Sequence, residues 1–137
     1  MAFIVQSMFQ CREPLLGEFL IMSEALFAGR QILLVEDEYL IAWALQDVLT
    51  NCGAHVVGPA ASVEDALELL EHEDVDGAIL DVSLGHDKVY PVAAALTARN
   101  IPFVFATGYT DLPLTWQHIP RFEKPVNATS TALALFG

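Results

Sequence analysis

Five polar side chains each follow a run of apolar residues in this sequence, and together they could support phosphoryl chemistry. They are three carboxylates, one hydroxyl and one ammonium group: Glu36, Asp37, Asp81, Thr107 and Lys124. Carboxylates that crowd together repel each other, so a cation must neutralise them where they meet. A site whose ligands are all oxygen atoms favours a hard cation, Mg²⁺ before Zn²⁺.

With Mg²⁺ present, one aspartate can attack phosphorus as a nucleophile and form an aspartyl phosphate. Such a transfer needs positioning and charge neutralisation more than covalent assistance. Thr107 could then donate a hydrogen bond to one phosphoryl oxygen, and Lys124 could pair with another. Each feature alone has an ordinary explanation, because an acidic pair often caps a helix and a lysine before proline is usually solvated. Their joint placement is what carries the prediction, since ligands of parallel sheets bind beyond the carboxyl ends of the strands.

The elements that must position these residues alternate regularly along the chain. Short apolar runs predict five strands, and segments with helical spacing between them predict helices; a loop is expected over residues 82–88. Pro113 leaves room only for a short or irregular helix before the last strand. This alternation predicts an α/β fold, a doubly wound five-stranded parallel sheet with helices on both faces. The predicted strands cover residues 32–35, 54–58, 77–80, 101–106 and 119–123, and the predicted helices cover 39–51, 63–70, 90–99 and 127–136.

The first thirty residues stand outside this alternation, so we predict an N-terminal extension over 1–30 and one folded domain over 31–137. Within the extension an apolar stripe, spaced as on one side of a helix, predicts a short amphipathic helix. An equally simple interpretation is an upstream extension with a natural start at Met22. The stripe consists of Leu15, Phe19, Met22 and Leu26.

Composition limits the classes of partner. The chain has 137 residues, is 54% hydrophobic and carries a net charge of −12, which is typical of a globular domain rather than a disordered tail. Such a surface repels nucleic acid phosphates and anionic lipids, so no nucleic acid partner and no membrane association are expected. Cys11 and Cys52 show neither metal-binding nor disulfide spacing, and no signal sequence is recognisable, so a cytoplasmic location is predicted.

Taken in order, these motifs resemble the receiver domains of two-component response regulators. The motifs are Leu34-Val35-Glu36-Asp37, Leu80-Asp81, Thr107 and Lys124-Pro125, and the likeness covers roughly residues 31–136. The resemblance implies a flavodoxin-like α/β/α fold and phosphorylation of Asp81. It also implies Mg²⁺ held by Glu36, Asp37, Asp81 and the main-chain carbonyl of Ser83, with Thr107 and Lys124 binding and sensing the phosphoryl group.

The implied partners are a histidine kinase or phosphotransfer protein as phosphoryl donor and a downstream protein target. The oligomeric state stays open. The family consists of signalling phosphoacceptors rather than enzymes, apart from their own phosphorylation and dephosphorylation.

Residues 102–109, Pro-Phe-Val-Phe-Ala-Thr-Gly-Tyr, are similar to a subset called FATGUY regulators, which are often single-domain proteins; Thr110 departs from the tyrosine in that name. Gly108, Tyr109 and Arg121 are expected to modulate the site. Arg121 stands where most receivers have a switch aromatic, so we predict a change of order in residues 109–118, few buried contacts there, and no ring rotation.

Two other functions were weighed. An aspartate-nucleophile phosphatase of the haloacid-dehalogenase type would need a second aspartate two positions after the nucleophile, where this sequence has Ser83. A pseudo-receiver that only binds partners would be expected to lack a metal carboxylate or the lysine, and both are present here.

Overall fold

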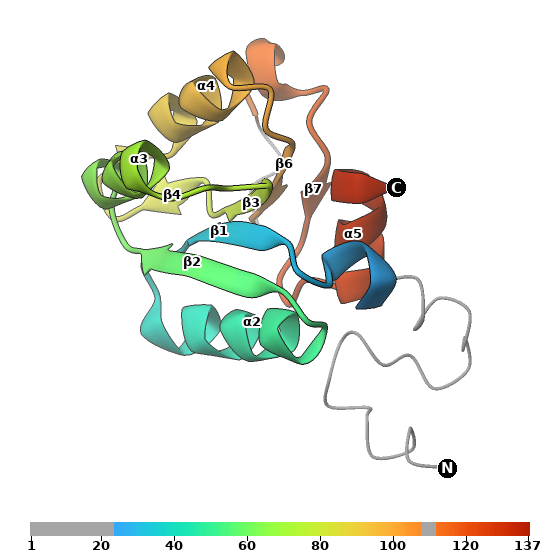
Figure 1. Ribbon diagram of the computed structural model, residues 1–137. Helices are drawn as coiled ribbons and strands as arrows, with labels where there is room; N and C mark the ends of the chain where they lie inside the picture. Colours follow the sequence, from blue (N-terminus) through green and yellow to red (C-terminus); the bar gives the residue numbers. More distant parts are fainter. Residues whose placement is uncertain (1–23, 108–111) are drawn as a thin grey trace.

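A five-stranded parallel sheet forms the centre of the computed structural model, which describes residues 24–107 and 112–137. The strand order is β2-β1-β3-β6-β7 (Figure 1). Every residue of β3 and β6 is buried, because helices cover both faces of the sheet and leave no polar side to these strands. The strands are β1 (Gln31–Val35), β2 (His55–Ala60), β3 (Gly77–Leu80), β6 (Phe103–Ala106) and β7 (Arg121–Phe122).

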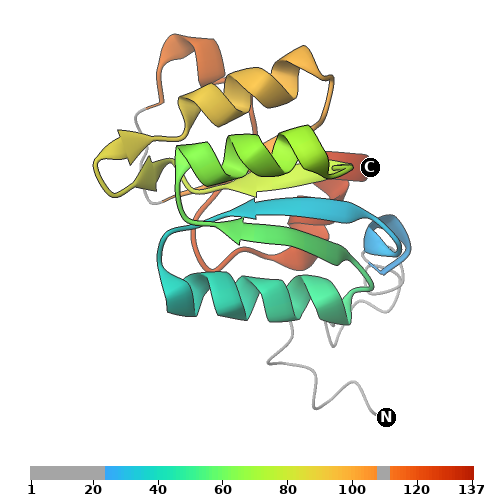
Figure 2. The same cartoon turned by 60° about the vertical axis from the view of Figure 1, so that its left-hand side comes forward.

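Four helices form the outer layers. Helices α3 (Val63–His72) and α4 (Tyr90–Ala98) cover one face of the sheet, and α2 (Tyr39–Asn51) and α5 (Ala128–Phe136) cover the other (Figures 1 and 2). Alternate residues of β1 pack into two separate hydrophobic clusters, one beneath each pair of helices. The predicted three-layer, doubly wound α/β fold is confirmed.

Helix starts follow the sequence signals. The Ser62 hydroxyl accepts a hydrogen bond from the Asp65 amide at 3.1 Å, and the Asn127 side chain accepts one from the Ser130 amide at 2.9 Å. Each cap satisfies an amide at the helix start that has no partner within the helix.

The predicted loop over residues 82–88 is wrong. Its ends pair as a small antiparallel hairpin, β4 (Ser83–Leu84) and β5 (Asp87–Lys88), with Gly85 in the turn at a φ of 66°. Leu84 is buried in the core cluster beneath α3 and α4, which anchors the hairpin to the domain. The segment is too short to show a strand periodicity in the sequence.

Before β7 the chain is better packed than its sequence predicted. It makes a single 3₁₀ turn, η2 (Leu114–Trp116), and Leu112 is buried. Trp116 stacks on Tyr90, with ring centroids 6.2 Å apart, and contacts the edges of Phe103 and Phe105. The expectation of few buried contacts therefore holds for residues 113–115, 117 and 118, which are exposed, whereas Leu112 is buried and Trp116 contacts three rings. Residues 108–111, including Gly108 and Tyr109, lie outside the described residues.

At the N-terminal side, residues 24–27 are helical and precede β1. Phe27 is fully buried and packs edge-to-face on Phe136 of α5. The boundary at residue 30 stays a prediction, although the core begins a few residues before it. Leu15, Phe19 and Met22 lie outside the described residues, and none of the helices described is long and apolar enough to cross a membrane.

Candidate functional site

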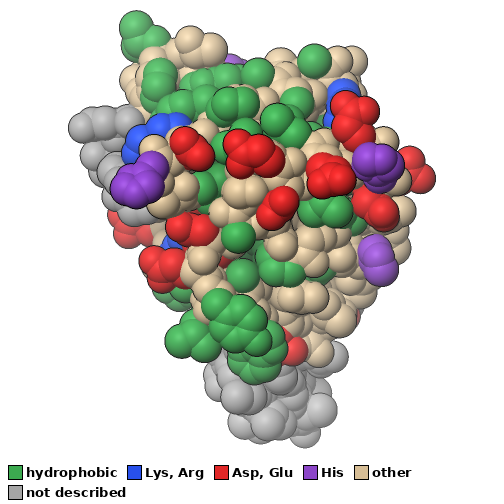
Figure 3. All heavy atoms as spheres, turned by 90° about the vertical axis from the view of Figure 1, so that its left-hand side faces the viewer, with side chains coloured by type: hydrophobic (Ala, Val, Ile, Leu, Met, Phe, Trp, Pro, Cys, Tyr) green, Lys and Arg blue, Asp and Glu red, His purple; other side chains and the backbone are tan. Residues whose placement is uncertain are grey.

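The strand ends bring the predicted site residues to one edge of the sheet. Asp81 follows β3, which lies between β1 and β6, so the residues after those two strands flank it. Figure 3 looks onto this edge and shows acidic side chains spread across it. An open hollow here is lined by Asp37, Glu38, Asp81, Ser83, Gly85, Thr107 and Lys124.

Three carboxylates form the acidic centre of this hollow. Glu36, Asp37 and Asp81 each offer an oxygen atom, and these atoms lie within 4.8 Å of one another. Glu36 and Asp81 are buried, whereas Asp37 is exposed to solvent. Three carboxylates at this spacing fit a hard divalent cation, because carboxylate oxygens are among the ligands that Mg²⁺ prefers.

Lys124 bridges two of the carboxylates. Its Nζ donates hydrogen bonds to Glu36 Oε1 at 2.5 Å and to Asp81 Oδ2 at 3.1 Å. Burial by itself would lower the pKa of Lys124, but the hydrogen bond to Glu36 and the charge of Asp81 outweigh it and raise that pKa. Lys124 therefore stays charged and holds the two carboxylates together without a metal.

The pKa of Glu36 depends more on burial than on the hydrogen bond from Lys124. Burial is the largest influence on it and raises its pKa, although the hydrogen bond from Lys124 opposes the shift. Both pKa values are therefore raised, but for different reasons. Burial outweighs the hydrogen bond at Glu36, whose side chain is almost completely buried, whereas the two carboxylates outweigh burial at Lys124, which keeps part of its side chain in solvent. A buried carboxylate beside a second one is stabilised by added positive charge, which further favours a cation here.

Main-chain amides fix both buried carboxylates. The Ser83 amide donates to Asp81 Oδ1 at 3.3 Å, and the Glu38 amide donates to Glu36 Oε2 at 3.1 Å. The backbone amide of Ser83 thus holds the Asp81 side chain, and the contribution of the Ser83 carbonyl to a metal site stays a prediction. The hairpin adds a contact that sequence reasoning missed, since Lys88 Nζ donates to Ser83 Oγ at 2.8 Å.

Thr107 and Arg121 differ in exposure. Thr107 is 3% exposed at the end of β6 and still lines the hollow, and its amide donates to the Phe122 carbonyl at 3.0 Å. Arg121 is exposed on β7. Thr107 is therefore brought to the site and linked to β7, whereas Arg121 does not line the hollow.

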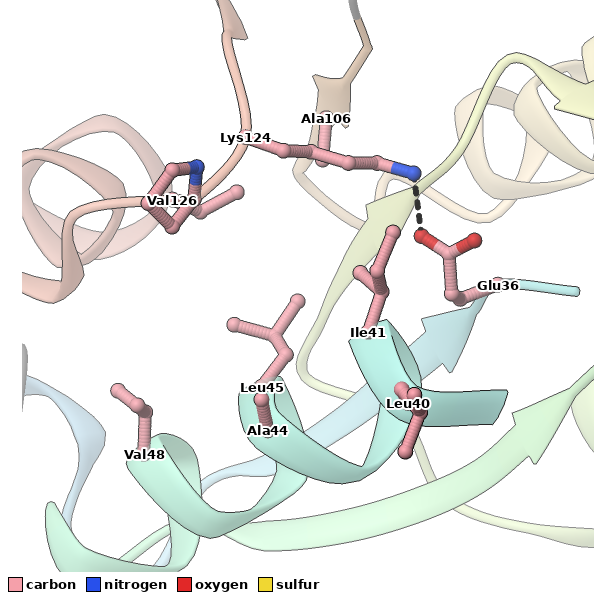
Figure 4. Close-up of a pocket in the computed structure, with 10 residues that line it drawn as sticks. Glu36, Leu40, Ile41, Ala44, Leu45, Val48, Ala106, Lys124 and Val126 are labelled. Atoms are coloured by element: carbon pink, nitrogen blue, oxygen red, sulfur yellow. Dashed lines mark hydrogen bonds and ion pairs between the residues drawn. The ribbon is translucent and has the colours of Figure 1, made fainter. Parts of the chain in front are cut away.

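An apolar pocket of about 390 Å³ adjoins the site between α2 and the chain that follows β7 (Figure 4). Figure 4 shows Lys124 extending above Ile41 towards Glu36, with Leu45 and Val48 further along α2. The Lys124 side chain lines this pocket, and its ammonium group reaches the carboxylates beyond it. Beside it, α2 exposes three large apolar side chains, Tyr39, Leu40 and Trp43.

Comparison with known proteins agrees with this geometry. The family model for the response regulator receiver domain matches residues 32–120. The solution structure of SdrG from Sphingomonas melonis Fr1 is 42% identical, with a TM-score of 0.70, over 78% of this chain and 96% of that one. The BeF3-activated conformation of SdrG from Pseudomonas melonis Fr1 is 44% identical, with a TM-score of 0.68, over 79% and 97% of the two chains.

Curated relatives are longer. The transcriptional regulatory protein PdtaR of Mycobacterium tuberculosis is 31% identical over 86 residues, which is 62% of this chain and 42% of PdtaR. The chain thus spans less than half the length of this relative.

Proposed function

This chain belongs to the response regulator receiver domain family, and we propose that it accepts a phosphoryl group on Asp81 in a Mg²⁺-dependent reaction. One observation carries the proposal: Asp81 lies with two further carboxylates within 4.8 Å and with Lys124 at 3.1 Å. A nucleophilic carboxylate, a cation site and a fixed ammonium group are the parts that this transfer requires.

Each residue has a defined task in the proposed reaction. An Asp81 oxygen attacks phosphorus, and the bond between phosphorus and the donor's leaving group breaks. Glu36, Asp37, Asp81 and the Ser83 carbonyl would hold Mg²⁺, which would supply positive charge for the phosphoryl oxygens. Lys124 and the Thr107 hydroxyl bind the remaining phosphoryl oxygens.

A histidine kinase or a phosphotransfer protein is the proposed donor, and the phosphorylated form signals to a downstream protein. The acidic surface supports protein partners over nucleic acid. The two alternatives are weaker. Ser83, which donates its amide to Asp81, cannot serve as the general acid of a phosphatase, and a pseudo-receiver would not need the assembled site.

Incubation with acetyl phosphate tests the function directly. With Mg²⁺ present, the intact mass should rise by one phosphoryl group, and the modification should be lost on treatment with hydroxylamine. Chelation of Mg²⁺ should prevent the increase, because the three carboxylates would then repel the anionic donor. An unchanged mass at saturating acetyl phosphate and Mg²⁺ would reject the proposal.

The proposed switch is residues 109–118, which begin two positions after Thr107. Phosphorylation adds charge beside Thr107 and Lys124 and should draw both towards Asp81. We expect amide hydrogen exchange over residues 112–118 to slow when beryllium fluoride and Mg²⁺ are added.

A Trp116→Ala variant should exchange faster in this segment without ligand, because its ring contacts hold η2 on the core. The exposed Trp43→Phe variant provides the matched control. Identical protection of residues 112–118 in both states of the wild type would show that the segment is fixed.

A further inference from the structure

The hairpin after β3 carries a second ammonium group to the edge of the site. Ser83 and Lys88 are paired across β4 and β5, so that their side chains lie on the same face of the hairpin. Lys88 Nζ donates to Ser83 Oγ at 2.8 Å, and the Ser83 amide donates to Asp81 Oδ1 at 3.3 Å. Ser83 therefore links the Lys88 ammonium group to the Asp81 carboxylate through two hydrogen bonds.

The charge distribution makes this position unusual. From residue 31 to residue 98 the sequence has thirteen acidic residues and one basic residue, Lys88. Acidic side chains dominate the edge of the sheet seen in Figure 3. A single cation in such a stretch, placed beside the hollow, reduces the repulsion that an approaching anion meets.

The phosphorylated site would need this charge. Glu36, Asp37 and a phosphoryl group on Asp81 bring about four negative charges, whereas Mg²⁺ and Lys124 bring about three positive ones. Lys124 already uses two of its three N–H donors on carboxylates, so it has one left for a phosphoryl oxygen.

We infer that Lys88 is a second phosphoryl-binding residue, which rests on Ser83 Oγ and turns to a phosphoryl oxygen once Asp81 is modified. The inference deepens the proposed function and rests on it. The lysine side chain has several rotatable bonds, and Lys88 is exposed, so the movement needs no change in the backbone. The hairpin thereby supplies a ligand for the phosphoryl group itself rather than for the metal.

The test measures beryllium fluoride and Mg²⁺ binding separately by calorimetry on the full chain. We expect Lys88→Ala to raise the half-saturating concentration of beryllium fluoride by about five- to tenfold, as loss of a charge-assisted hydrogen bond would. Mg²⁺ affinity should stay the same or rise by up to about twofold, because a nearby positive charge is removed. Lys88→Arg should retain most of the beryllium fluoride affinity, and Arg99→Ala, at the end of α4 and paired with Glu71, should match the wild type.

Two outcomes for Lys88→Ala would overturn the inference. One is beryllium fluoride binding equal to that of the wild type. The other is an equal loss of Mg²⁺ and beryllium fluoride affinity with a lower melting temperature, which would assign Lys88 to hairpin stability. If the wild type itself failed to bind beryllium fluoride in Mg²⁺, the proposed function would fall together with this inference, whereas an unaffected variant beside a binding wild type rejects the role of Lys88 alone.

Discussion

The Asp81→Asn variant should gain no phosphoryl group from acetyl phosphate, with the rate of modification reduced by at least about 100-fold. The asparagine side chain has nearly the same shape and can still accept the hydrogen bond from the Ser83 amide. It has no negatively charged oxygen to attack phosphorus, so the fold should persist while the reaction is lost. Intact-mass measurement after a timed incubation with Mg²⁺ gives the result.

Asp87→Asn provides the matched control for that experiment. Asp87 is an exposed aspartate in β5, only six positions along the chain, and it lies outside the three-carboxylate cluster. This variant should be phosphorylated at the wild-type rate. Modification of Asp81→Asn at the normal rate would assign the phosphoryl group to another residue.

The central sheet could be predicted from the sequence because its strands are buried on both faces. Continuous apolar runs such as Ile79 and Leu80, followed at once by a charged residue, mark both a strand and its end. Since the carboxyl ends of parallel strands share one edge, the same pattern predicts that Asp37, Asp81 and Lys124 lie together. The apolar runs that predict the strands therefore also predict which residues form the site.

The hairpin could not be predicted in this way, because tertiary contacts rather than local patterns stabilise it. The short helix η2 agrees with the short or irregular helix that Pro113 predicted, but its packing on the core could not be predicted. Each strand of the hairpin has two residues, and Leu84 holds it through the core. Trp116 fixes η2 through rings that come from α4 and β6, far away along the chain. Sequence spacing likewise gave no sign that Lys88 reaches Ser83, because that contact depends on the register of the hairpin.

The sequence predicts that Lys124, Glu36 and Asp81 belong to one site, but it does not predict that Lys124 pairs with both carboxylates. The lysine was expected to pair with a phosphoryl oxygen, and in the structure it pairs with Glu36 and Asp81 instead. Residue types cannot show which carboxylates a lysine contacts before ligands bind. This bridge divides the acidic cluster into two carboxylates that share the single positive charge of Lys124 and one, Asp37, that faces solvent.

That division leads to the second large effect, on Mg²⁺ binding. We expect Asp37→Ala to weaken Mg²⁺ binding by at least tenfold, about 1.4 kcal/mol. A divalent cation entering from solvent meets Asp37, the exposed member of the cluster, while Lys124 already offsets the charge of the other two carboxylates. Calorimetric titration of Mg²⁺ into protein freed of metal by chelation measures the change.

Glu38→Ala separates ligation from general charge in this experiment. Glu38 is exposed and lines the same hollow, but it is not part of the three-carboxylate cluster, so its removal should change Mg²⁺ affinity by less than about threefold. Without metal, Asp37→Ala should melt at the wild-type temperature or slightly above it, because a like charge beside Glu36 and Asp81 is gone and the Lys124 bridge is intact. Equal weakening of Mg²⁺ binding by both substitutions would mean that the edge attracts the cation only through its overall charge, and unchanged affinity in Asp37→Ala would place the metal elsewhere.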